Sequence, residues 1–353
     1  MNTHRESKRF ALRLFGLAAA AFLCLSTWAS AGGPVADFPG FIPFAVQKTG
    51  DVAVDKIGNV YVNVTLGTSV YIRKFNPDGD FSGDTYIGTG TAYGLAVDAN
   101  GDIYAAITGP YRGVYRVDHH GIVLRLPGTE HIFWANALAF DPRGNLYVTE
   151  SSSDSVGALG GIWRIPPKGD AERLLQHELL TGTGALQGPA NPIGANGIAY
   201  FHGNLYVVNT DKALIVQVPI RPDGSLGQPE VWKQLKEVTG SPLAGSPFPL
   251  AGDGMALDVH GNVYVAMVTR LAVVKINAED LSQETIAVLG SDPKLTFALL
   301  DMPNSLGFGT GKGERQSLFI TNLGTMKNYI PTLSWPGPGL VKIEAGVPGL
   351  PLP

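Results

Sequence analysis

The stretch that decides the fold is DVAVDKIGNVYV, residues 51–62. Apolar and polar residues alternate on both sides of a central Gly-Asn, and two such runs around a glycine-containing turn are typical of a β-hairpin. The pattern recurs in five further segments, the last of them degraded: GLAVDANGDIYA (94–105), NALAFDPRGNLYV (136–148), NGIAYFHGNLYV (196–207), DGMALDVHGNVYV (253–265) and NSLGFGTGKGERQSLFI (304–320). A hairpin that returns along the whole chain indicates a repeat architecture.

A third apolar run follows each hairpin: YIRKF (71–75), VYRV (114–117), IWRI (162–165), IVQV (215–218), VVKI (273–276) and LVKI (340–343). Most of these runs lead into a turn and a weaker fourth run. Four strands repeated six times predict an all-β fold, a six-bladed β-propeller of four-stranded blades. The last copy is short, so we expect the N-terminal strand FIPFAV (41–46) to close the ring and remove an exposed edge. A pair of β-sandwiches is the alternative.

The composition favours the same class. The 353 residues include 45 Gly and 25 Pro, with 44% hydrophobic and only 16% charged residues. Many turns and few charges suit short strands rather than a helical bundle, and the hydrophobic fraction argues against disorder. A net charge of −4 without a basic stripe argues against nucleic-acid binding. The chain has no G-x-S-x-G or H-E-x-x-H motif, which argues against a serine hydrolase and a zincin.

The first residues predict a secretory signal peptide. Basic residues precede an apolar run at 14–25, and Ala29-Ser30-Ala31 has the small residues of a cleavage site. We expect cleavage after Ala31, which leaves residues 32–353 as a single periplasmic or secreted propeller domain with no membrane segment. An uncleaved anchor and a lipidated Cys24, the only cysteine, are the alternatives. The mature chain then has no disulfide or thiolate chemistry.

One residue per blade is predicted to lie at the mouth of the central channel. Alignment on the second-strand aromatic residues gives these six mouth positions: Gly50, Tyr93, Asn136, Asn196, Asp253 and Asn304. Four of the six are Asn or Asp, whose oxygen atoms are hard ligands suited to calcium. The alternative is that they cap strand starts for backbone reasons. Four at equivalent positions favour an ion site or a site for a polar substrate.

The segments NALAF, NGIAY and DGMAL at these positions resemble the senescence-marker-protein/gluconolactonase family, regucalcin-like propellers. The sequence resembles NHL-repeat and strictosidine-synthase-like propellers less closely. The resemblance implies one calcium ion, with Asn136, Asn196 and Asp253 as ligands, and hydrolysis of lactones or related esters. It also implies that Asp253 acts in catalysis. The family has a Glu where this chain has Gly50; Asp51 could replace it only if the strand start is irregular, since a one-residue slip reverses a side chain.

Further residues are candidates from their position alone. Asn304 is a possible additional ligand, and Tyr93, His131 and Glu150 are expected to contact substrate. The connectors GPANPIGAN (188–196) and GSPLAGSPFPLAGD (240–253), and residues 322–339, are expected to reach the same mouth. Elaborate connectors that converge on one face favour a binding site.

Two functions follow from these patterns. The first is an exported calcium-dependent hydrolase of lactones or related esters; the second is a non-catalytic periplasmic propeller that binds a small ligand or a protein through the same face. The main expected partner is a small molecule, as substrate or ligand, and no nucleic acid is expected to bind. A ring with no exposed edge needs no second subunit, which is compatible with a monomer, and the sequence leaves the oligomeric state open.

Overall fold

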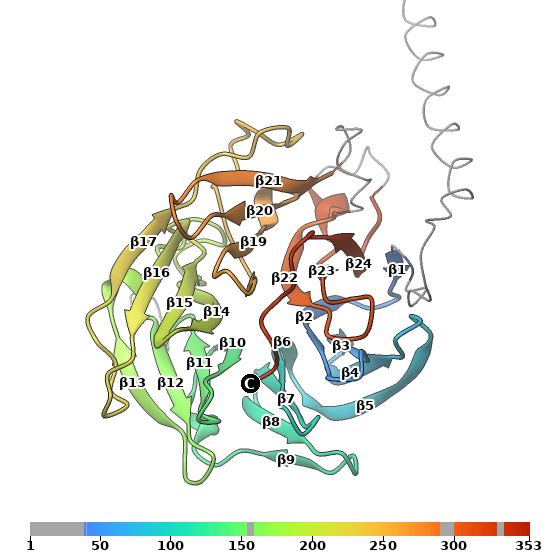
Figure 1. The fold of residues 1–353 in the computed structure, drawn as a ribbon, viewed down its shortest axis with the longest axis vertical. Coiled ribbons are helices and arrows are strands. Elements are labelled where there is room, and N and C mark those ends of the chain that lie inside the picture. The colour runs from blue at the N-terminus through green and yellow to red at the C-terminus, as the bar shows by residue number, and fades with distance from the viewer. Residues whose placement is uncertain (1–38, 40, 154–158, 290–299, 330–334) are drawn as a thin grey trace, which may run out of the picture. The chain divides into compact units, whose positions relative to one another are not determined.

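The computed structural model describes residues 39, 41–153, 159–289, 300–329 and 335–353, and the predicted signal peptide lies outside them. The described residues form six antiparallel sheets of four strands each, arranged as a ring (Figure 1). The first strands of neighbouring blades contact one another around the centre. The predicted six-bladed β-propeller is therefore confirmed. No helix in the described ranges is long and apolar enough to cross a membrane.

The strands follow the repeat. The first three blades are β2 Lys48–Val54, β3 Val60–Leu66, β4 Ser69–Phe75 and β5 Phe81–Thr89; β6 Thr91–Val97, β7 Ile103–Thr108, β8 Gly113–Val117 and β9 Val123–Arg125; and β10 Ala135–Phe140, β11 Leu146–Glu150, β12 Gly161–Ile165 and β13 Glu172–Gln176. The fourth and fifth are β14 Ala195–Phe201, β15 Asn204–Asn209, β16 Leu214–Pro219 and β17 Glu230–Gln234; and β18 Met255–Leu257, β19 Val263–Met267, β20 Ala272–Ile276 and β21 Gln283–Val288.

The sixth blade joins the two ends of the described chain. It consists of β22 Pro303–Phe308, β23 Ser317–Asn322, β24 Gly339–Glu344 and, as the outer strand, β1 Phe41–Pro43. The pairing of β1 with β24 sets Phe41 opposite Val341. This confirms the expected ring closure, although the strand is shorter than the apolar run at 41–46. Four short 3₁₀ helices complete the described elements: η1 Thr129–His131, η2 Glu178–Leu180, η3 Val268–Arg270 and η4 Met326–Asn328.

The recurrent Asp of the hairpin motif has a structural role. In the first blade Asp55 Oδ1 accepts the backbone N–H groups of Ile57 and Asn59, each at 3.0 Å. Its Oδ2 accepts the Asn59 amide at 2.7 Å and the Tyr61 hydroxyl at 3.0 Å. Gly58 supplies the positive φ of 92° that the turn requires. Asp141 and Asp258 repeat this bond pattern in the third and fifth blades. The motif thus fixes the turns at the face opposite the mouth.

Apolar side chains on facing sheets fill the space between blades. One cluster combines Tyr61 and Ile72 of the first blade with Leu95 and Ile107 of the second, and every one of them is buried. Burial of this kind between successive blades supplies the main free energy of folding. It also holds the six inner strands rigidly around the channel.

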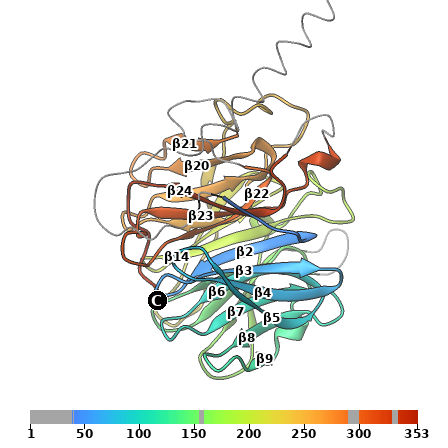
Figure 2. The same cartoon turned by 90° about the vertical axis from the view of Figure 1, so that its right-hand side faces the viewer.

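The last residues of the sequence, 347–353, cross the ring at the hairpin-turn face, and Figure 1 shows this end of the chain near the ring centre. Val259 N donates to Pro348 O at 3.0 Å, and Leu350 N donates to Leu257 O at 3.2 Å. Leu352 packs against the cluster between the first two blades. Figure 2 shows this end at one edge of the ring in side view. The tail therefore covers part of that end of the channel, which nothing in the repeat pattern indicates.

Candidate functional site

The inner strands begin irregularly at the mouth. The pairing register shifts between Thr49 and Val52 in the first blade, and the equivalent shift occurs in the second, third, fourth and sixth blades. In the fifth blade Asp253 precedes β18 and is held by its N–H to Ala266 O at 2.9 Å. Such bulges re-aim side chains next to a functional site. All six mouth positions, together with Asp51, line one cavity of about 100 Å³.

The two predicted amide ligands are fixed by hydroxyl groups. Asn136 Nδ2 donates to Ser151 Oγ at 2.8 Å, and Asn196 Nδ2 donates to Thr210 Oγ1 at 2.9 Å. Both Asn side chains are buried. Each amide nitrogen is committed to the protein frame, so the amide oxygen is the atom that each side chain can offer to a ligand.

Asn304 is a brace between the sixth and first blades. Its Nδ2 donates to Gly50 O at 3.0 Å. The Thr49 hydroxyl lies 3.3 Å from its Oδ1, but the shorter bond of that hydroxyl, at 2.6 Å, goes to Asn322 O. Asn304 therefore links the two blades through its amide nitrogen, and its amide oxygen stays the atom that it can offer to a ligand.

Close packing explains why position 50 is a glycine. A Cβ atom there would lie 2.1 Å from Asn63 Oδ1 and 2.5 Å from the carbonyl oxygen of Tyr93. Asn63 is fully buried on β3, and its Nδ2 bridges the carbonyls of Tyr93 and Gly94, each at 2.9 Å. The volume that a Glu at position 50 would need is thus filled by Asn63. No acidic side chain fits at that position.

Asp51 supplies the second carboxyl group instead. The irregular strand start that its participation required is present, and its side chain lines the cavity. Leu95 N donates to Asp51 Oδ2 at 3.4 Å, and the Ser305 side chain also bonds to it. These partners follow the mouth positions of the second and sixth blades in sequence. Asp51 therefore lies among the inner strands together with Asp253.

The two carboxyl groups influence each other. Burial raises the pKa of Asp51 to about 8, and the charge of Asp253 adds to this rise. Burial likewise raises the pKa of Asp253 to about 7, against the opposing effects of Lys48 and an Asn196 hydrogen bond. The Lys48 ammonium lies 3.5 Å from the centroid of the Tyr93 ring. Two acidic groups this close favour a proton or a cation between them.

Of the three residues that were expected to contact substrate, one lines the cavity and two do not. Tyr93 lines the cavity and meets Trp134 edge to face, with ring centroids 5.9 Å apart. His131 instead lies exposed on η1, 3.8 Å from Glu130. Glu150 is fully buried; it accepts Phe133 N and Trp163 Nε1, each at 2.8 Å, and pairs with Arg173 at 3.2 Å. Neither His131 nor Glu150 is among the residues that line the central cavity.

Several cavity residues were not singled out from the sequence. Lys48 and Trp134 each lie two residues before a mouth position, so strand alternation was the available signal. An adjoining cavity of about 150 Å³ shares five residues with the first: Gln187, Ile193, Asn196, Asp253 and Leu323. Most of its other lining residues are apolar, and four of them come from the predicted connectors: Leu243, Phe248, Met326 and Tyr329. The connectors do converge on the mouth, as expected.

One buried carboxylate holds the connector at 183–193. Asp211 Oδ2 accepts the backbone N–H groups of Thr183, Gly184 and Ile193 at 3.0, 2.7 and 2.9 Å. Its Oδ1 accepts Leu186 N at 3.1 Å. Four backbone donors thus converge on a single side chain that is only 8% exposed. This positions the connector against the cavity.

We expect Asp211→Ala to lower the free energy of unfolding by about 3 kcal/mol, because the connector's N–H groups lose a charged acceptor. Urea denaturation measures this change. The matched control is Asp223→Asn, which alters an exposed turn carboxylate bonded to Ser225, and we expect its stability to stay close to that of the unchanged protein. An Asp211→Ala protein as stable as this control would show that the four bonds to Asp211, the Asp211 clamp, do not hold the connector.

The donor set fits a calcium ion. Carboxylate and amide oxygens are the ligands that calcium prefers, and the Asp51–Asp253 pair supplies the negative charge. Within the described part of the chain, no three His, Cys, Asp or Glu side chains gather at one point. An ion here would therefore rely on amide oxygens, such as those of Asn136 and Asn196, besides the two carboxylates.

Fold and cavity together define a six-bladed propeller with an acidic and amide-lined mouth. Residues 129–290 match the family described as SMP-30/Gluconolactonase/LRE-like region. The resemblance seen in the sequence is thus confirmed, and this part of the chain is similar to that family. The matched segment carries Asn136, Asn196 and Asp253, whereas Asp51 and Asn304 lie outside it. No curated protein sequence matches the chain.

Solved structures show the same fold. A luciferin-regenerating enzyme is 16% identical with a TM-score of 0.61, and the match covers 88% of this chain and 98% of that one. A calcium-binding protein, regucalcin, from Agrobacterium tumefaciens is 15% identical with a TM-score of 0.58, over 91% of this chain and 99% of that one. At these identities the likeness establishes the fold alone.

Proposed function

We propose that this chain is an exported, calcium-assisted hydrolase of lactones or related esters that acts at the mouth of the propeller. The observation that carries the proposal is the convergence of Asp51, Asp253, Asn136 and Asn196 on one small cavity. The family match and a structural relative named calcium-binding support it. The apolar run at 14–25 supports export.

The residues of the mouth suit a hydrolytic step. A calcium ion, when bound, would polarise the substrate carbonyl as a Lewis acid. The Asp253 carboxylate takes a proton from a water molecule as the water oxygen bonds to the carbonyl carbon. The ring C–O bond then breaks, and the leaving oxygen receives that proton to give the hydroxy acid. A base whose pKa is near 7 is suited to this exchange at neutral pH.

Two observations favour a second function. Asn63 excludes a Glu at position 50, and Lys48 lies beside the acidic pair. A cation site weakened in this way favours a propeller that binds a small ligand or a protein without turning it over.

The test is hydrolysis of D-glucono-δ-lactone, δ-valerolactone and p-nitrophenyl acetate by chelated protein, before and after calcium is restored. We expect turnover of at least one lactone that falls at least ~10-fold on chelation and returns with calcium. Turnover indifferent to calcium would contradict the calcium part of the proposal. Absence of turnover of lactones and ester alike with calcium present would overturn the hydrolase and favour the binding propeller.

A further inference from the structure

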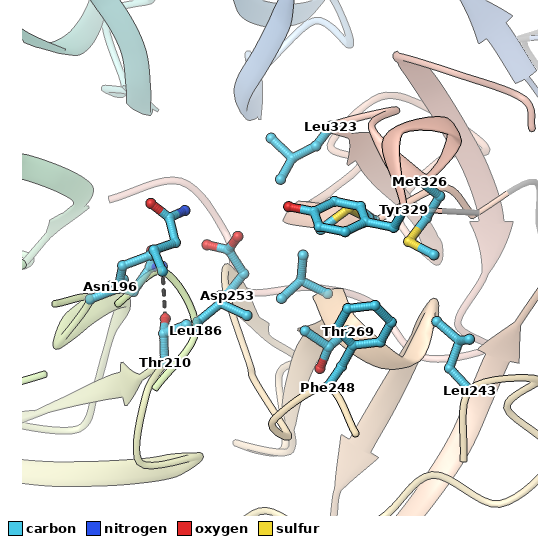
Figure 3. Close-up of a pocket in the computed structure, with 14 residues that line it drawn as sticks. Leu186, Asn196, Thr210, Leu243, Phe248, Asp253, Thr269, Leu323, Met326 and Tyr329 are labelled. Carbon is cyan, nitrogen blue, oxygen red and sulfur yellow. Dashed lines mark hydrogen bonds between the residues drawn. The ribbon is translucent and has the colours of Figure 1, made fainter. Parts of the chain in front are cut away.

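The cavity of about 150 Å³ beside Asp253 has a polar side and an apolar side. Figure 3 shows Asp253, Asn196 and Thr210 on one side, with Tyr329, Phe248, Met326 and Leu243 on the other. Phe248 and Tyr329 meet edge to face, with ring centroids 5.7 Å apart and an interplanar angle of 85°. We call the side formed by Leu243, Phe248, Leu323, Met326 and Tyr329 the apolar subsite. It opens directly onto the carboxylate that the proposed reaction uses.

Thr269, the polar residue next to Phe248, is already hydrogen-bonded within the protein, which leaves the Tyr329 hydroxyl as the polar group of the apolar subsite. Thr269 Oγ1 donates to Pro249 O at 2.8 Å and accepts Ala251 N at 3.2 Å. Thr210 Oγ1 accepts the amide of Asn196. A substrate group with several hydroxyls placed there would leave water and find too few hydrogen-bond partners, which disfavours it. An apolar group would instead gain from leaving water.

Buried charges hold the connectors that form this subsite. Arg270 is only 3% exposed, and both of its terminal nitrogens donate to Phe248 O at 3.2 Å. Its Nε donates to Glu237 at 2.5 Å. These bonds fix the connector at 240–253 relative to η3.

The connector after β23 is held in a similar way. Asp301 is fully buried, and its carboxylate accepts Met326 N and Gly337 N, each at 3.0 Å. Together with the Asp211 clamp, a buried charged side chain thus serves each of three connectors. The apolar subsite is therefore built in advance of binding, which reduces the ordering cost for a ligand.

From this arrangement we propose that the apolar subsite receives the apolar substituent of the substrate, so that the preferred substrate is an alkyl- or aryl-substituted lactone or ester. The preference among substrates rests on the proposed function, whereas the binding of an apolar group at this subsite does not. The whole cavity of about 150 Å³ equals an apolar protein cavity known to take benzene, and the apolar subsite is only part of it, so the buried part of the substituent is smaller than about six carbons. A polyhydroxylated sugar lactone is correspondingly a poor substrate.

Three δ-lactones with the same ring test the preference among substrates in calcium-loaded protein: δ-decalactone with a pentyl group, unsubstituted δ-valerolactone, and D-glucono-δ-lactone. Each buried methylene contributes about fourfold in affinity. If two to three of the five pentyl carbons are buried, kcat/KM for δ-decalactone exceeds that for δ-valerolactone by about 30-fold. We expect D-glucono-δ-lactone to be the poorest of the three. Turnover with sugar lactone as the best substrate would overturn the inference and leave the hydrolase standing.

Binding of lactams, which resist hydrolysis, tests the subsite independently of turnover. By calorimetry we expect 6-pentylpiperidin-2-one to bind about 30-fold more tightly than piperidin-2-one. Tight binding without turnover of any lactone would support the subsite and contradict the hydrolase. Equal affinity for the two lactams would overturn the subsite.

Phe248→Ser tests whether this side chain forms the wall of the apolar subsite. Leu243→Ser is a second variant in case the first does not fold. We expect each to bring the ratio of the two lactam affinities close to one, because the apolar wall is lost. The control is Val231→Ser on β17, which removes a side chain 49% exposed outside both cavities, and it should keep the full ratio. An unchanged ratio in folded Phe248→Ser protein would contradict the assignment of the wall.

Discussion

Replacement of Asp253 by Asn is expected to lower kcat/KM for lactone hydrolysis by about 10³-fold or more. An amide of the same shape cannot accept the proton of the attacking water, and loss of a general base alone costs 10²- to 10⁴-fold. Asp253 is also one of the two carboxylates that face the cavity, so the variant should bind calcium more weakly as well. Steady-state kinetics on δ-valerolactone, with calcium in excess, measure the loss.

The matched control is Asp84→Asn, which removes an acidic group that pairs with Arg73 at 2.8 Å on the outside of the first blade. We expect this protein to retain its activity within about twofold, because it changes the net charge by the same amount far from the mouth. If Asp253→Asn, shown to be folded, hydrolyses δ-valerolactone as fast as this control, Asp253 is not the base.

The calcium-free protein is expected to lose stability as the pH rises from 5 to 9. The pKa values of Asp51 and Asp253 in the folded protein, about 8 and about 7, lie well above the 3.8 of the free side chain. Between pH 4 and 8 the folded state therefore holds protons that the unfolded state has released, and its free energy of unfolding falls with pH. Both groups are half-buried and reached by water from the cavity, so we expect a total loss of about 3 kcal/mol rather than the full linkage value.

Urea denaturation at successive pH values measures this fall. In Asp51→Asn/Asp253→Asn the neutral amides no longer titrate, and we expect a nearly flat profile, whereas Asp84→Asn should keep the slope. Calcium added to the unchanged protein should reduce the fall, because it favours the charged carboxylates of the folded state. Equal slopes in the double variant and the unchanged protein would show that other groups control the pH dependence.

Sequence periodicity was sufficient for the fold because the propeller is a repeat. Each blade carries its own alternation and its own Asp-containing turn, so six weak local signals supported one another. Ring closure by the strand at 41–43 followed from the missing outer strand of the last copy. The mouth positions could be predicted for the same reason, since one register applies to all blades.

The parts of the site that break the repeat could not be predicted in this way. The glycine at position 50 is explained by the packing of Asn63 and the carbonyl of Tyr93 against it, which is a contact between strands rather than a local pattern. Glu150 ends β11 as expected but is drawn into a buried pair with Arg173. The apolar subsite is formed by connectors without periodicity, and only their convergence on one face was readable. Their positions depend on single buried charges such as Asp211 and Asp301.

The central claim is that the acidic and amide-lined mouth holds a calcium ion in the folded protein. The direct test is the thermal unfolding midpoint of chelated protein as calcium, magnesium or zinc is titrated back. At a calcium concentration 100 times the dissociation constant, we predict a gain of about 2.7 kcal/mol and a rise of about 4 °C. We predict that the rise is selective for calcium and is lost in Asp253→Asn. A midpoint that no ion moves, or that calcium raises equally in Asp253→Asn, would contradict the calcium site at this mouth.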